Sequence, residues 1–410
     1  MASHDDDNNN NINGTGQPNG ISPTRRKPVW RNVVENFSPL WFTLAMNTGI
    51  LGVLFHQQPW QFDGLYIIST IMYVFTIILF AIFSIITVFR WTVFHRTTVS
   101  KTHGDINEIS LLGTAPIAWF TITALTALIP SNAYWGHHAF TILAVVMWWF
   151  GSLWMVVTCI GVCIAIAQHD VVYDRTMSTA LFLPAVGVAT DAVVGGLICN
   201  YAYGMTARLA VPILITSYFL DGLAVFVSLE IYTLFFHRLM TSGWPEPAKL
   251  PGLILLVGPF GQTAAALLLA GSAASTAMDF PHYDKGTFLT MMGAEGVTSA
   301  GTLIALLLLG HDFFWIVVAC GGIGVGVMNR TLTYSLLWWA TIFPLATVAT
   351  AFISLSVSMN SPTFRALAAI ITVFLTIDYL INWGFTIWYT INGDLLIKNE
   401  TKDVEEQKVD

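Results

Sequence analysis

Ten long apolar stretches constrain this chain more than any other feature of its sequence, because each is about 20 residues or longer and can cross a bilayer as a helix. Hydrophobic residues make up 55% of the chain and charged residues only 10%, whereas a soluble domain averages about 25% charged residues. The sequence therefore predicts an all-α polytopic membrane protein with ten transmembrane helices. The stretches lie near residues 38–56, 64–89, 109–129, 138–167, 178–203, 206–236, 251–275, 291–328, 333–358 and 364–392.

The eighth stretch leaves the count open, because it is long enough to contain a break at Gly310, His311 and Asp312. An eleventh span would put the two termini on opposite sides of the membrane. The distribution of basic residues favours ten spans. With a cytoplasmic N-terminus, 14 of the 17 Lys and Arg residues lie inside. Only three lie outside, namely Arg208, Lys285 and Arg365.

The polar ends of the chain differ in composition from the region between them. Residues 1–30 are rich in Asn and Asp, and residues 396–410 are mostly charged or polar. Such segments cannot bury enough apolar surface to fold, so both are predicted to be disordered cytoplasmic tails. Residues 31–395 form the predicted ten-helix transporter domain. No zinc, haem or P-loop spacing occurs, and we expect no metal site and no cofactor.

Each odd-numbered stretch contains a proline. A proline in the interior of a continuous helix costs about 3 kcal/mol of stability relative to alanine. The even-numbered stretches are richer in unbroken Leu, Ile, Val and Trp. A broken backbone in the bilayer must face protein or a water-filled cavity. The pattern therefore predicts five helical hairpins, with odd helices kinked around a central pore and even helices outside. A simpler interpretation is that these prolines only bend helices around their neighbours. The five prolines of the odd-numbered stretches are Pro39, Pro116, Pro184, Pro259 and Pro344.

The polar residues of the odd stretches are mainly hydroxyls and amides. Backbone N–H groups at helix breaks can hold an anion without a fixed cation, so this lining suits a desolvated anion or a neutral solute. The predicted pore-lining residues are Asn47, Thr48, Thr114, Pro116, Asp191, Gln262, Thr263 and Thr341.

Asp191 is the exception among these residues, because it is an acid within an odd stretch. Intramembrane acids often mark proton pathways. It has two interpretations: a carboxylate that is hydrogen-bonded to a neighbouring helix, or an acid that carries a proton during transport.

Four motifs resemble the tellurite-resistance/dicarboxylate transporter family, which includes plant slow anion channels, malic acid permeases and fungal sulfite efflux pumps. They are "NFSPLWFTLAMNTGI" (36–50), "MSTALFLPAVGVAT" (177–190), "LVGPFGQTAAALLL" (256–269) and "WWATIFPLAT" (338–347). The resemblance covers about residues 30–395 and is greatest to the sulfite pumps. It implies a plasma-membrane protein that forms homo-oligomers, a trimer by family with a dimer as the alternative. It also implies that Phe343 is the aromatic gate and that Gln262 contacts substrate.

The gate assignment has a simpler alternative, in which Phe343 is a core aromatic packed against Trp338 or Trp339. Three features depart from the sulfite pumps. Thr263 and two alanines follow Gln262, Asp191 replaces a small residue, and "QPWQFDGLYIIS" (58–69) resembles the malic acid permeases.

The leading prediction is an exporter of sulfite or bisulfite, with protons as an additional candidate partner. The alternatives are a transporter of malate or another C4-dicarboxylate and an anion channel of the same fold. A dicarboxylate requires positive charge at both ends, and the odd stretches have no Lys or Arg in their interiors. An intramembrane enzyme would need a nucleophile or converging histidines, so we predict no enzymatic activity. A receptor or scaffold would not need a break in every inner helix. No feature indicates nucleic-acid binding.

Overall fold

The computed structural model describes residues 29–168, 177–275, 280–283, 285–393 and 395. In these residues the chain is helical and contains no strand, apart from one isolated bridge between Lys285 and Leu289. Ten segments in the described part are long and apolar enough to cross a membrane. This confirms an all-α polytopic membrane protein. The predicted tails lie almost entirely outside the described residues, but α1 (Val29–Glu35) begins two residues before the predicted tail boundary.

The even-numbered spans are long single helices. The eighth, α12, runs without interruption through Gly310, His311 and Asp312, so it is one span and the predicted alternative of a break there is wrong. The five helices are α3 (Leu65–Val93), α7 (His137–Gln168), α9 (Ala207–Ser242), α12 (Met291–Met328) and α14 (Pro362–Ile391).

Each odd-numbered span consists of a 3₁₀ segment followed by an α-helix. The first four are η1 (Pro39–Trp41) with α2 (Phe42–Gln57), η2 (Leu111–Gly113) with α6 (Thr114–Leu128), η5 (Thr179–Phe182) with α8 (Leu183–Tyr201), and η6 (Pro247–Val257) with α10 (Gly258–Ala274). The ninth span is η7 (Leu336–Thr341) with α13 (Ile342–Ser358).

The prolines lie at these junctions and not in the interior of a continuous α-helix. Pro184 and Pro259 are second in their α-helices, Pro116 and Pro344 are third, and Pro39 begins η1. In the first turn of an α-helix an N–H has no intrahelical acceptor, so proline loses no hydrogen bond there. The interior cost of about 3 kcal/mol is therefore avoided.

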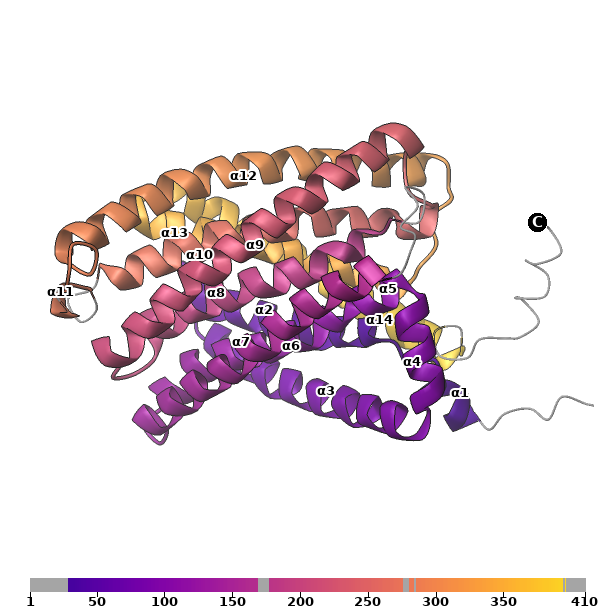
Figure 1. Cartoon of the computed structure of the whole chain (residues 1–410), viewed down its shortest axis with the longest axis horizontal. Coiled ribbons are helices and arrows are strands. Elements are labelled where there is room, and N and C mark those ends of the chain that lie inside the picture. The colour runs from indigo at the N-terminus through magenta and orange to yellow at the C-terminus, as the bar shows by residue number, and fades with distance from the viewer. Residues whose placement is uncertain (1–28, 169–176, 276–279, 284, 394, 396–410) are drawn as a thin grey trace, which may run out of the picture.

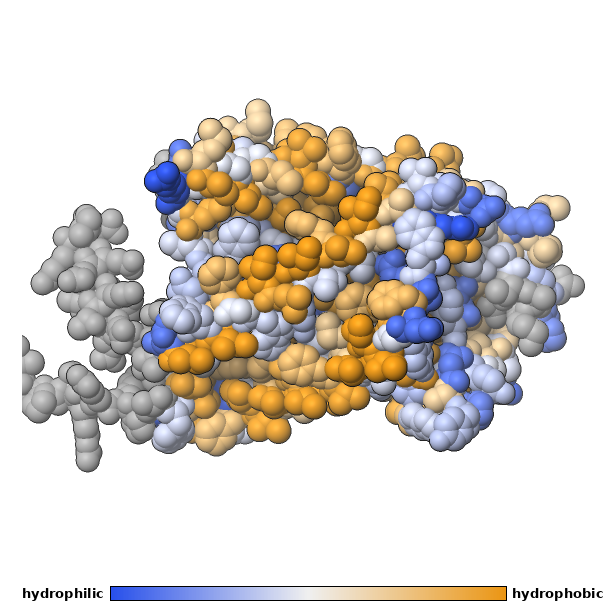
Figure 2. Space-filling view, turned by 180° about the vertical axis from the view of Figure 1, so that it is seen from behind, coloured by the Kyte–Doolittle hydropathy of each residue, from blue (hydrophilic) through white to orange (hydrophobic). Residues whose placement is uncertain are grey.

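The odd spans are enclosed and the even spans face outward. In an apolar 18-residue stretch of each span, 78–94% of residues are buried in the odd spans but only 17–44% in the even spans. Each odd span packs against the even span that follows it, and the long helices run side by side along the longest axis of the molecule (Figure 1). Apolar side chains cover the middle of the face in Figure 2, between more polar ends. The even helices thus provide a lipid-facing surface around an inner group of five spans.

Short helices connect the spans. α4 (His95–Gly104) precedes the third span and α5 (Ile106–Ser110) begins it, at the same end of the molecule as α1, while α11 (Phe280–Tyr283) lies at the opposite end (Figure 1). η3 (Pro130–Asn132) ends the third span. Side-chain caps mark the starts of several helical segments. At the start of η1, for example, Ser38 Oγ accepts a hydrogen bond from the N–H of Leu40 at 3.3 Å.

Candidate permeation pathway

The Gly-Pro-Phe-Gly-Gln-Thr motif forms the first turns of α10, which packs against the inner helices α8 and α13. A Cβ added to Gly261 would overlap the hydroxyl of Thr347 on α13 and lie 3.2 Å from Oδ2 of Asp312 on α12. Gly258 is similarly close to α8, since a Cβ there would lie 3.0 Å from Cγ2 of Val186. The two glycines therefore allow three helices to approach α10 closely.

Three of the predicted lining residues connect neighbouring inner spans. Gln262 Nε2 donates to Thr190 Oγ1 at 2.8 Å and links α10 to α8. Asn47 Nδ2 donates to the carbonyl of Trp339 at 2.7 Å and links α2 to η7. The hydroxyl of Thr114 donates to the carbonyls of Pro39 and Leu111, each at 2.8 Å. Side chains thus satisfy carbonyls in the 3₁₀ segments, where the helix ends leave backbone groups without an intrahelical partner.

Three other predicted residues form hydrogen bonds with outer helices. The hydroxyl of Thr48 lies 2.9 Å from that of Tyr379 on α14, and Thr341 donates to Asp378 Oδ2 on the same helix at 2.6 Å. Asp191 accepts from Ser152 on α7 at 2.7 Å, which is the bond to a neighbouring helix that its first interpretation predicts. Thr263 is also buried, and its hydroxyl has no hydrogen-bond partner among the described residues. The three bonds attach inner helices to outer ones.

Several polar atoms near the motif have no hydrogen-bond partner among the described residues. They include one carboxyl oxygen of Asp191, one of Asp221 and both of Asp312, in residues that are at most 4% exposed. An unpartnered buried polar group costs about 1–3 kcal/mol. A water or solute that reached this level would find hydrogen-bond partners at these atoms. The position of Asp312 beside Gly261 could not be predicted from the sequence, since sequence does not give the rotation of one helix against another.

The candidate gate is buried. Phe343 is 1% exposed, on the first turn of α13. Trp339 turns to α14, where its ring centroid lies 5.6 Å from that of Tyr379 and 5.5 Å from that of Trp383. The predicted lining residues are also buried, from Asn47 at 0% to Thr341 at 7% exposure. Neighbouring residues therefore enclose each of these side chains.

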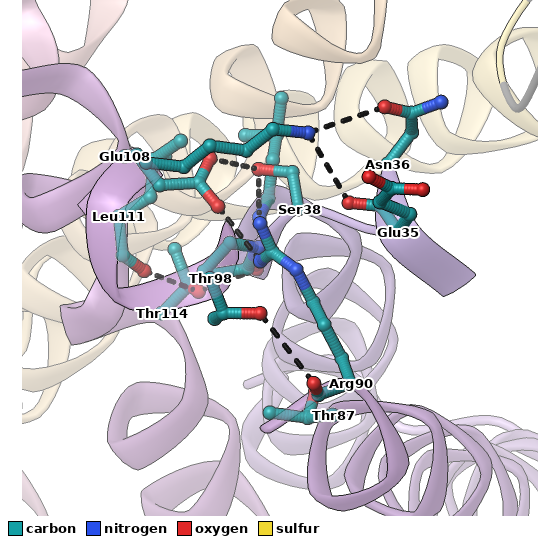
Figure 3. A network of polar contacts seen from close by, with 12 residues as sticks. Glu35, Asn36, Ser38, Thr87, Arg90, Thr98, Glu108, Leu111 and Thr114 are labelled. Atoms are coloured by element: carbon teal, nitrogen blue, oxygen red, sulfur yellow. Dashed lines mark hydrogen bonds and ion pairs between the residues drawn. The ribbon is translucent and has the colours of Figure 1, made fainter. Parts of the chain in front are cut away.

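The end of the molecule that carries α1 has a polar network not anticipated from the sequence (Figure 3). Arg90, near the end of α3, makes a 2.7 Å ion pair with Glu108 on α5, and Ser38 donates to the same carboxylate at 3.3 Å. Lys101 donates to Asn36 Oδ1 at 3.3 Å. An open pocket of about 500 Å³ borders these residues. The network joins the starts of the first and third spans to the end of the second.

Comparison with known proteins identifies the family of this ten-span chain. Residues 36–387 match the SLAC1 family, described as voltage-dependent anion channels. This match extends from the first span into the last. The chain belongs to the SLAC1 family. The predicted family resemblance is therefore confirmed, and this SLAC1-family chain is a multi-pass anion transport protein.

Individual relatives carry more specific names. A sulfite efflux pump SSU1 of Arthroderma benhamiae is 26% identical over 371 residues, which cover 90% of this chain and 95% of the pump. The malic acid transport protein of Schizosaccharomyces pombe is 22% identical, over 90% of this chain and 82% of that protein. An uncharacterized transporter of Methanocaldococcus jannaschii, MJ0762, is 22% identical over 77% of this chain and 83% of its own length. All three are transporters by name, in agreement with the prediction of a transport protein that is not an enzyme.

Proposed function

We propose that this SLAC1-family protein exports sulfite or bisulfite across the plasma membrane, with both termini in the cytoplasm. The observation that carries the proposal is the composition of the five buried spans, which contain Lys249 near one end but no other Lys or Arg. A dicarboxylate crossing them would find no fixed positive charge for its second carboxylate. The sulfite efflux pump named above also matches this chain more closely and more completely than the malic acid transport protein does.

The hydrogen bond of Gln262 supports a position for its side chain among the buried spans. Its Nε2 donates to Thr190 Oγ1 on α8, so the amide lies between two inner spans. The side chain is only 1% exposed. We therefore assign Gln262 as the amide that contacts the anion.

Helix periodicity supports the assignment of Phe343 as the gate. Thr341 faces α14 through its bond to Asp378. Two residues later a side chain has turned by about 200–240°, whether the step is counted as α or 3₁₀. By this count Phe343 would point away from α14 toward the other inner spans, where a buried aromatic ring would act as the gate of a closed pathway.

Each protomer would contain its own pathway, because all five inner spans come from one chain. Homo-oligomers, trimeric by family, would associate through the apolar outer helices. Asp191 accepts a hydrogen bond from Ser152 on α7, so protonation there would act on the packing of α8 against α7 and would not require contact with the anion.

Flux measurements test the proposal. The purified full chain is reconstituted into liposomes that contain sodium sulfite or sodium malate, and the amount of each anion released into anion-free buffer is measured directly in the external solution over time. Sulfite release well above that of protein-free liposomes, with slower malate release, is the expected result. Equal background rates for both anions would refute anion export.

Malate is the second candidate, because the malic acid transport protein aligns over 90% of this chain. Release of malate at a higher rate than sulfite in the same liposomes would favour it over sulfite.

A further inference from the structure

Four of the five buried spans end at a common open pocket, opposite the end that carries α1. It has a volume of about 500 Å³ and is lined by residues from α2, α6, α8 and α13, and by the first turn of α14. A second pocket, of about 530 Å³, shares three of its lining residues: His56, Leu128 and Tyr201. We call the two together the exit vestibule. Because inner spans converge there, a solute that leaves the enclosed region at this end enters the vestibule.

The vestibule has a positive charge. Arg365, on the first turn of α14, is the one Lys, Arg, Asp or Glu among the residues that line the two pockets. Its Nη2 donates to Oδ1 of Asn360 at 2.8 Å. That neutral amide orients the guanidinium without cancelling its charge. Among the described residues no carboxylate lies within ion-pair distance of Arg365. Its remaining N–H groups can serve an anion.

His56 provides the second polar group. Nδ1 of its ring is buried and has no hydrogen-bond partner in the described part of the chain. The ring packs against Tyr66, with centroids 5.5 Å apart. Gln61 Nε2 donates to the carbonyls of Phe55 and His56, at 3.0 and 3.1 Å, and so holds the turn after α2. Because Nδ1 is enclosed while the residue as a whole is half-buried and lines both pockets, Nε2 is the ring nitrogen that can offer an N–H to a ligand in the vestibule.

We propose that the exit vestibule is an anion-binding site, in which the Arg365 guanidinium and an N–H of His56 hold a small oxyanion or carboxylate. The site lies at the end of the buried spans, which themselves lack fixed cations in their interiors. It gives the anion its first strong positive partner as it leaves that uncharged region. The direction of movement rests on the proposed export function, but binding itself does not.

Binding is measured on the full chain in detergent by isothermal titration calorimetry with sodium sulfite and, separately, sodium malate. Arg365→Gln is expected to weaken binding about tenfold or more, since a charge-assisted contact is lost. Arg365→Lys keeps the charge but lacks the planar guanidinium, so its affinity for the anion should lie between those of the wild type and Arg365→Gln. The control is Arg208→Gln, which removes an exposed arginine at the same end that does not line the vestibule. It should leave binding unchanged.

The inference is wrong if neither anion binds the wild-type chain, or if the changes at positions 365 and 208 have equal effects. His56→Gln should also weaken binding, and a wild-type value there would remove His56 from the site. Failure of the proposed function looks different, because liposomes with the wild-type chain would release neither anion even though titration shows a site that depends on Arg365.

Discussion

The close approach at Gly261 gives a quantitative test of the inner helix packing. In Gly261→Ala the new methyl group would overlap the hydroxyl of Thr347 and lie 3.2 Å from the Asp312 carboxylate. Thr347 cannot rotate freely, because its hydroxyl donates to the carbonyl of Pro344 at 2.6 Å. Overpacking of this kind typically costs about 1–3 kcal/mol, and we expect a loss in that range.

The second substitution Thr347→Ala removes the overlapping hydroxyl. Combined with Gly261→Ala it should recover most of the lost stability, since the two residues interact directly. The matched control is Gly310→Ala on α12, where an added Cβ meets no atom within 4 Å. There the gain in helix propensity, up to about 1 kcal/mol, should leave stability unchanged or slightly higher.

The assay is thermal unfolding of the detergent-solubilised full chain, followed by intrinsic tryptophan fluorescence. We expect the order of melting temperatures, from highest to lowest, to be Gly310→Ala, the double variant, then Gly261→Ala. If Gly261→Ala melted with the Gly310→Ala control, the approach of α12 and α13 to α10 would not be as close as described. If the double variant gave no recovery, Thr347 would not be the obstacle.

Three further predictions concern the pathway and its inner end. Phe343→Ala should raise anion leak through liposomes at rest, whereas Phe352→Ala, in a partly buried residue on the same helix, should not; equal leak would remove Phe343 from the gate. Asp191→Asn should shift the pH dependence of efflux if that acid carries a proton, and an unchanged profile would leave it a packing role. Arg90→Gln should destabilise the fold by about 3 kcal/mol because it leaves a largely buried carboxylate unpaired. Lys249→Gln, in a solvent-exposed pair, should cost under about 1 kcal/mol, and similar melting temperatures for the two variants would contradict this.

The sequence predicted the ten spans and the division into inner and outer helices because both depend on composition. Hydropathy locates a span, and the odd spans were separated from the even ones by proline and polar content. Burial of 78–94% in the apolar stretches of the odd spans follows the same division. The uninterrupted course of α12 through Gly310 could not be decided, since a glycine within an apolar stretch is compatible with a helix or with a break.

The positions of the helix breaks were less predictable. A proline such as Pro259 was expected to interrupt a helix, yet it lies second in α10 after an eleven-residue 3₁₀ segment. Sequence gives the residue that cannot donate an N–H, but it does not give the side of that residue on which the regular α-helix lies.

The faces of the inner helices were the least predictable feature, since composition does not give the rotation of a helix about its axis. Thr48, Asp191 and Thr341 were expected to line a pore, and each has a hydrogen bond to an outer helix. Polar residues in a buried span therefore have two uses: attachment to an outer helix through a hydrogen bond that lipid cannot provide, and contact with a solute.

The contacts of each polar residue distinguish these two roles, attachment to an outer helix and contact with a solute. In α10, Gln262 donates to Thr190 on α8, which is another inner span. In η7, Thr341 instead donates to Asp378 on the outer helix α14. If Gln262 and Phe343 line the pathway, as we propose, it would combine one polar contact with one hydrophobic barrier. Asp191 and Asp378 would then be engaged by Ser152 and Thr341 at the junctions between inner and outer helices.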